Sequence, residues 1–138
     1  MKTDYYVAGR VRNSENILRL NKGIKDKGYS CYSFLKEPGV MEESHLPFEE
    51  QIDLMESHPD FWTDPVHRHH FEEDMAGLKN ANTVVVLLPA GLASHMEAGA
   101  SYGLGKKLIL IGAVEKPETL YLMFDERYPD IESFFETI

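Results

Sequence analysis

The chain has little cysteine, little positive charge and no long hydrophobic run. Its one cysteine, Cys31, cannot form an internal disulfide, which favours a reducing cytoplasm and a packing role for the thiol. The formal charge of −9 argues against a nucleic acid polymer as partner, because DNA and RNA binding needs a basic surface. The apolar runs are too short to span a bilayer, and the start MKTDYYVAG resembles no secretory signal, so we expect no membrane partner.

A length of 138 residues with 43% hydrophobic content is typical of one globular domain, here residues 1–138. Apolar runs predict five strands: Asp4–Gly9, Tyr29–Leu35, Asn82–Leu88, Lys107–Gly112 and a short one near Arg127–Tyr128. Between them we expect helices from Asn13 or Ser14 to Gly28, and over Pro47–Ser57, Pro65–Lys79, Ser94–Leu104, Glu118–Phe124 and Ile131–Thr137.

This alternation predicts an α/β fold, a three-layer, doubly wound domain of the flavodoxin or Rossmann type with a mostly parallel sheet. In the common strand order 2-1-3-4-5, ligands bind beyond the carboxyl ends of the first and third strands. The loops Gly9–Asn13 and Pro89–Ser94 leave those strands. Gly9 and Gly91 let the backbone approach a ligand closely. Arg10 and Arg12 either pair with a phosphate there or are surface cations.

The most informative segment is LLPAGLASHMEAGASYGLGK, residues 87–106. We expect Ser94 to cap the helix and Glu97 to fall in its first turn, where the helix dipole favours an ionised carboxylate. Such a carboxylate can act as a nucleophile or stabilise a positive charge. The alternative is a capping box, in which Glu97 only reaches back to the Ser94 backbone.

Several further side chains have two interpretations each. Tyr6 either reaches the crevice with its hydroxyl or packs within its strand, and Asp74 belongs either to the site or to a solvated helix face. Phe61 and Trp62 either stack on a base or anchor the long connection over residues 36–64. The histidines in HRHH, residues 67–70, lack further matched ligands, so we expect no metal site.

Three patches together resemble the nucleoside 2-deoxyribosyltransferase-like superfamily, which includes deoxynucleoside 5'-monophosphate N-hydrolases. They are YVAGRVR at Tyr6–Arg12, Asp74 on the helix before the third strand, and Glu97 in EAGASYGLGK. The hydrolases of that superfamily carry a serine six residues before the nucleophile, where this chain has Gly91; Ser94 is nearer.

The resemblance implies cleavage or transfer of an N-glycosidic bond without a cofactor. Glu97 would be the nucleophile, Tyr6 would orient it, and Asp74 would act on the ribose hydroxyl or the departing base as an acid. The substrate, a nucleoside or a nucleoside 5'-monophosphate, would be bound by Gly9, Arg10, Arg12, Gly91, Ser94 and Trp62.

The alternatives of hydrolase or transferase, and of nucleoside or monophosphate, remain open at this stage. So does a non-catalytic nucleotide-binding or sensing module of the same fold. We also expect a homo-oligomer, because related enzymes assemble and because Phe134, Phe135 and Ile138 would leave an apolar patch exposed at the end of the chain.

Overall fold

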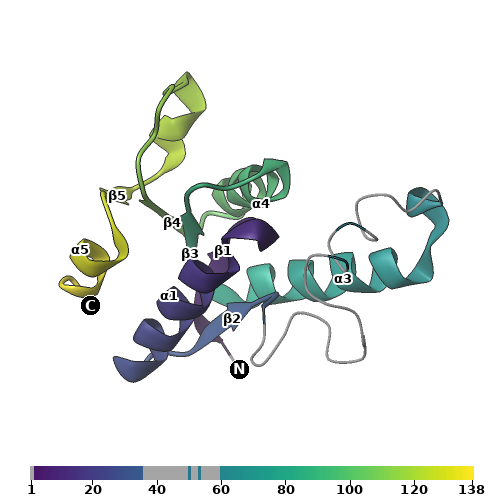
Figure 1. The fold of residues 1–138 in the computed structure, drawn as a ribbon, viewed down its shortest axis with the longest axis horizontal. Helices are drawn as coiled ribbons and strands as arrows, with labels where there is room; N and C mark the ends of the chain where they lie inside the picture. Colours follow the sequence, from purple (N-terminus) through teal and green to yellow (C-terminus); the bar gives the residue numbers. More distant parts are fainter. Residues whose placement is uncertain (1, 36–49, 51–52, 54–59) are drawn as a thin grey trace.

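The computed structural model describes residues 2–35, 50, 53 and 60–138. Its centre is a five-stranded sheet in the order β2-β1-β3-β4-β5, in which every neighbouring pair is parallel (Figure 1). The strands are β1 Thr3–Ala8, β2 Cys31–Ser33, β3 Ala81–Leu87, β4 Lys107–Ile111 and β5 Glu126–Tyr128. The predicted fold class and strand order are confirmed. The second strand is shorter than the predicted Tyr29–Leu35, because only three of its residues pair with β1.

Helices cover both faces of this sheet. The α-helices are α1 Ser14–Asp26, α3 Pro65–Asn80, α4 Leu92–Gly103 and α5 Ile131–Phe135, and the 3-10 helices are η1 Val11–Asn13, η2 Phe61–Thr63 and η3 Thr119–Met123. The segment predicted as a helix near Glu118–Phe124 is therefore a 3-10 helix. The predicted helix Pro47–Ser57 lies outside the described residues except for Glu50 and Asp53, which are both helical.

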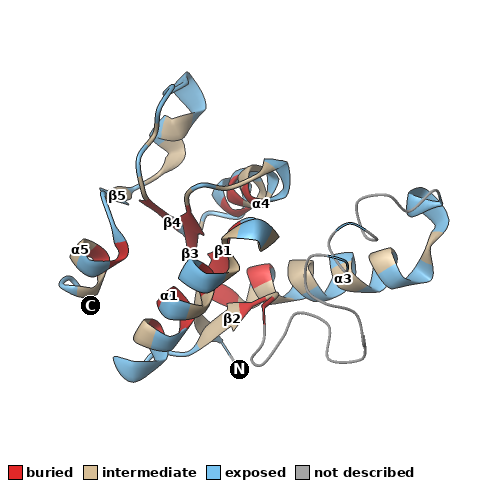
Figure 2. Ribbon diagram, in the orientation of Figure 1, coloured by how far each residue is buried: buried red, intermediate tan, exposed pale blue. Residues whose placement is uncertain are grey.

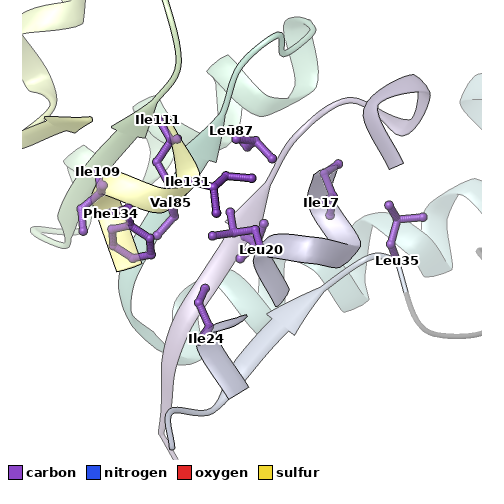
Figure 3. Close-up of a cluster of buried hydrophobic side chains, with 11 residues drawn as sticks. Ile17, Leu20, Ile24, Leu35, Val85, Leu87, Ile109, Ile111, Ile131 and Phe134 are labelled. Atoms are coloured by element: carbon purple, nitrogen blue, oxygen red, sulfur yellow. The ribbon is translucent and has the colours of Figure 1, made fainter. Parts of the chain in front are cut away.

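One face of the sheet packs against α1 and α5 (Figure 3). Ile17, Leu20 and Ile24 recur at helical spacing along α1 and are fully buried. They contact alternate residues of the central strands, among them Val85 and Ile111. Alternation along the strands sends the intervening residues to the other face.

The second face packs against α3 and α4. Its buried strand residues are Tyr6, Ala8, Ala81, Val84, Val86, Leu108 and Leu110. Leu78 from α3 and Ala98 from α4 lie on them, and the two helices contact each other and share β3 beneath them. This is the face on which the Tyr6 side chain of β1 lies with α3 and α4.

The C-terminal segment is packed inward, contrary to expectation. Phe134 is fully buried, and Phe135 and Ile138 are half-buried against the cluster on the α1 side. The Phe135 ring occupies the space above Gly23 of α1, where a Cβ would lie 2.0 Å from it. The predicted apolar patch is therefore wrong, and the homo-oligomer stays a prediction that rests on the family resemblance alone.

Helix α3 extends beyond the sheet (Figure 1). Only Leu78, near its C-terminal end, is buried, and the half that leads from η2 is largely exposed (Figure 2). None of the helices in the described part of the chain is long and apolar enough to cross a membrane.

Candidate active site

The loops that follow β1 and β3 lie side by side at the carboxyl edge of the sheet. Gly9 is buried, and a Cβ there would lie 2.8 Å from the end of the Ile17 side chain, so α1 approaches the backbone closely at this glycine. A Cβ at Gly91 would lie 4.0 Å from the Cβ of Arg10. The first loop therefore contacts the start of α4, as expected where the winding of the sheet reverses.

Helix α4 begins earlier than the sequence indicated. Gly91 is the N-cap, the helix starts at Leu92, and no side chain makes a capping hydrogen bond. Ser94 is 2% exposed and lies with Ala98 and Ser101 on the buried side of the helix. The prediction that Ser94 caps the helix is wrong, and so is the capping-box alternative. A buried serine on the packed face also gives no support to substrate binding by Ser94.

Glu97 consequently lies in the second turn of α4 and faces β1. Its Oε2 accepts a hydrogen bond from the Tyr6 hydroxyl, and Tyr6 is itself 1% exposed. Tyr6 thus fulfils both interpretations, since its ring packs in the core while its hydroxyl contacts the carboxylate. The sequence-based pairing of these two residues agrees with the geometry.

The charge state of Glu97 differs from the expectation. The pKa of the Glu97 carboxyl is raised from its usual 4.5 to about 7, chiefly by burial; the Tyr6 hydrogen bond acts in the opposite direction, and the negative charge of Asp74 adds to the rise. The helix dipole does not hold Glu97 ionised, because its effect is confined to the first turn. Near neutral pH the carboxyl therefore exists in both protonation states.

Asp74 belongs to the same group of side chains, because Tyr32 connects it to Tyr6. The sequence analysis did not identify Tyr32. The Tyr32 hydroxyl of β2 donates to the Asp74 Oδ1 of α3 at 3.1 Å. The rings of Tyr32 and Tyr6 stack, with centroids 5.3 Å apart and planes inclined by 15°. Tyr6, Tyr32, Asp74 and Glu97 thus come from four different elements. The predicted strand order places the second strand beside the first, and the structure adds the register that pairs Tyr32 with Tyr6.

The two arginines of the first loop are both exposed. The Nη2 atom of Arg12 lies 3.4 Å from Oδ1 of Asp53, an exposed pair that contributes little stability. Both arginines lie in the loop that follows the carboxyl end of β1. The start of α4 lies at the same edge of the sheet. Their predicted contact with a phosphate is therefore compatible with the geometry.

Trp62 is remote from the four-residue group. It is 94% exposed in η2, before the start of α3, and makes an edge contact with Phe61. Asp74 lies nine residues after Pro65, about 13 Å along the helix axis. Phe61 instead packs on His67, with ring centroids 4.7 Å apart. In the described residues, no group of three histidine, cysteine, aspartate or glutamate side chains is arranged to hold a metal ion.

The fold is similar to that of enzymes acting on N-glycosidic bonds. A 2-deoxyribosyltransferase from Bacillus psychrosaccharolyticus superposes with a TM-score of 0.64 at 19% identity, over 96% of this chain and 90% of that one. A CMP N-glycosidase from Clostridium botulinum gives a TM-score of 0.53 at 14% identity, over 97% and 96% of the two chains.

A conserved protein from Enterococcus faecalis gives a TM-score of 0.54 at 13% identity, over 99% and 96% of the two chains. No protein-family model matches the chain, and no curated protein matches its sequence. At these identities the likeness shows the fold alone. The fold that the sequence resemblance implied is therefore confirmed.

Proposed function

We propose that this protein breaks or transfers the N-glycosidic bond of a nucleoside or a nucleoside 5'-monophosphate, with Glu97 as the nucleophile. The observation that carries the proposal is that Tyr6 donates a hydrogen bond to Glu97 and that Asp74 lies near enough for its charge to raise the pKa of Glu97. Most glycosidases use a pair of carboxyl groups, and Asp74 and Glu97 are two carboxyl groups that interact electrostatically in this structure.

In the first half of the reaction, a Glu97 carboxylate oxygen forms a bond to the anomeric carbon. The bond from that carbon to the base nitrogen breaks, its electron pair leaves with the base, and the base takes up a proton. In the second half, water or a second base attacks the same carbon, the bond from that carbon to Glu97 breaks with release of the carboxylate, and the attacking group gives up a proton in place of the one that the departing base took up. Water gives hydrolysis and a second base gives transfer.

The neighbouring side chains have distinct roles in this scheme. The Tyr6 hydroxyl orients the attacking carboxylate, and burial and the Glu97 charge both raise the pKa of Tyr6, so it stays a protonated donor. Asp74 acts on a sugar hydroxyl or supplies a proton to the departing base. The raised pKa of Glu97 means that its ionised, reactive form increases as the pH rises through neutrality.

The similar structures support an N-glycosidic bond as the bond that reacts. The substrate has to be identified by experiment. One similar protein is named as a 2-deoxyribosyltransferase and another as a CMP N-glycosidase. A 5'-phosphate would be held by Arg12, with Arg10, the Gly9 backbone and the backbone N–H groups at the start of α4 as further donors. It would replace the exposed Asp53 carboxylate as partner of Arg12.

Release of free base from a panel of nucleosides and 5'-monophosphates, followed by chromatography, tests the proposal. Release from at least one substrate supports it, and a second base added to the mixture separates transfer from hydrolysis. Binding of a nucleotide without any release would instead identify a non-catalytic binding or sensing module.

A further inference from the structure

Tyr32 makes a contact that its own strand does not require. β2 is a three-residue edge strand, and its pairing with β1 uses only the backbone. The Tyr32 side chain nevertheless crosses to α3 and donates its hydroxyl proton to Asp74 at 3.1 Å. A hydrogen bond to a carboxylate is stronger than one between neutral groups, and it restricts where the carboxylate can point.

The Tyr32 ring is held on two sides. One side stacks on the Tyr6 ring, and the other lies against Gly77 of α3. A Cβ at Gly77 would come within 2.8 Å of two ring atoms of Tyr32, so only glycine admits the ring at its observed position. Glycine is a poor residue for a helix interior. Gly77 follows Asp74 by three residues, which places the gap and the carboxylate on the same side of α3.

The carboxylates around the Tyr32–Asp74 hydrogen bond keep the Tyr32 hydroxyl protonated. Burial raises the pKa of the Tyr32 hydroxyl, and the negative charges of Asp74, Glu73 and Glu97 raise it further. Tyr6, from β1, is likewise a protonated donor. Each tyrosine therefore donates to one carboxylate, Tyr6 to Glu97 and Tyr32 to Asp74, and the stacked rings fix the two donors relative to each other.

We infer that Tyr32 is a positioning residue, which holds the Asp74 carboxylate beside Glu97, and that Gly77 is the glycine that makes room for it. The inference rests on the proposed function, because it deepens the role of Asp74 in that reaction. Tyr32 acts through Asp74, so its removal should matter only while Asp74 is present.

A double-mutant cycle on the full chain tests this dependence. Tyr32→Phe keeps the ring and its stacking and removes only the hydroxyl. We expect it to lower kcat/KM by about 10- to 100-fold, the effect of one hydrogen bond to a charged group. The double variant Tyr32→Phe with Asp74→Asn should be no slower than Asp74→Asn alone. Losses that multiply in the double variant would overturn the inference.

Matched controls are available in the same chain. The Tyr128 hydroxyl donates to Glu126 in β5, so Tyr128→Phe removes a similar hydrogen bond away from the site and should leave kcat/KM unchanged. Gly77→Ala should displace the ring and reproduce the loss seen in Tyr32→Phe. Gly99→Ala in α4, where a Cβ meets nothing within 4 Å, should cause no loss. A fully active Gly77→Ala variant would contradict the role given to Gly77.

A titration that needs no substrate separates this inference from the proposed function. The Glu97 carboxyl carbon, followed by NMR, should titrate near pH 7 in the unaltered protein and lower in Asp74→Asn, since that change removes a negative charge. Tyr32→Phe should move the midpoint towards the Asp74→Asn value. An unaltered midpoint in Tyr32→Phe would overturn the inference. Absence of base release in the unaltered protein would defeat only the proposed function.

Discussion

The Tyr6 hydroxyl donates a hydrogen bond to the Glu97 carboxylate, although 91 positions separate the two residues in the chain. The contact requires β1 to lie beside β3, and α4 to pack on the same face of the sheet, where it contacts β3 and β4. It also requires Glu97 to lie in the second turn of α4, where its side chain is half-buried. Partial burial of the side chain also raises the pKa of the Glu97 carboxyl.

The rate of base release should depend on pH through Glu97. A nucleophile must be ionised, and burial raises the pKa of this carboxyl to about 7. We therefore expect kcat/KM to increase between about pH 6 and pH 8 and to be roughly tenfold below its plateau one pH unit under the midpoint. A kcat/KM that decreases over this range would assign Glu97 the role of an acid.

Tyr6→Phe should move the midpoint upward. The Tyr6 hydrogen bond favours the charged form of Glu97 and lowers its pKa, so its removal leaves the effects of burial and of Asp74 unopposed. A hydrogen bond to a charged group corresponds to roughly one to two pH units. The variant should lose activity at pH 7 and recover part of it at pH 9. An unchanged profile would restrict Tyr6 to a packing role.

Glu97→Gln should stabilise the protein at high pH. Because the folded pKa of about 7 exceeds the usual 4.5, the protonated carboxyl favours the folded state below pH 4.5, and this contribution is lost as the pH rises through 7. The cost to the unaltered protein is about 3 kcal/mol above that range. Glutamine stays neutral, so urea unfolding should show Glu97→Gln more stable at pH 8 and similar at pH 4.5. If the unaltered protein and Glu97→Gln were equally stable at pH 8 as well as at pH 4.5, the raised pKa of Glu97 would be contradicted.

The role of Arg12 can be tested by comparing a nucleoside 5'-monophosphate with its nucleoside as substrate. If it holds a 5'-phosphate, a monophosphate should be processed about 10- to 100-fold better than its nucleoside, as one charge-assisted contact allows. Arg12→Ala should remove most of this preference and leave nucleoside turnover almost unchanged. Asp53→Ala, which removes the exposed partner of Arg12, is the matched control and should preserve the preference. Equal rates for the two substrates in the unaltered protein would leave Arg12 a surface cation.

The sheet was predictable because it depends on local patterns. The apolar runs of β1, β3 and β4 are buried, and their alternation with helices restricts the topology to a few orders. That order predicts where the glycines at the strand ends, Tyr6 and Glu97 lie in the fold. The contact between Tyr6 and Glu97 could therefore be predicted from the sequence.

The sequence-based predictions that were wrong or missing concern features that depend on packing. The cap of α4 is Gly91, which has no side chain to reveal it, whereas Ser94 matched a capping pattern and is buried. Phe134 was predicted to be exposed, because the sequence does not show that α5 folds back onto the sheet. The contact between Tyr32 and Asp74 spans 42 positions and depends on the gap at Gly77, so no local pattern marks it.

The most direct test of the central claim compares base release by the unaltered protein and by Glu97→Gln at pH 8, where most of the Glu97 carboxyl is ionised. The panel of nucleosides and 5'-monophosphates is the same for both, and circular dichroism confirms that both are folded. The account predicts release by the unaltered protein and a loss of at least about a thousandfold in the variant, as expected when a nucleophile is removed. Comparable rates in the two proteins, or no release by the unaltered protein from any substrate, would contradict it.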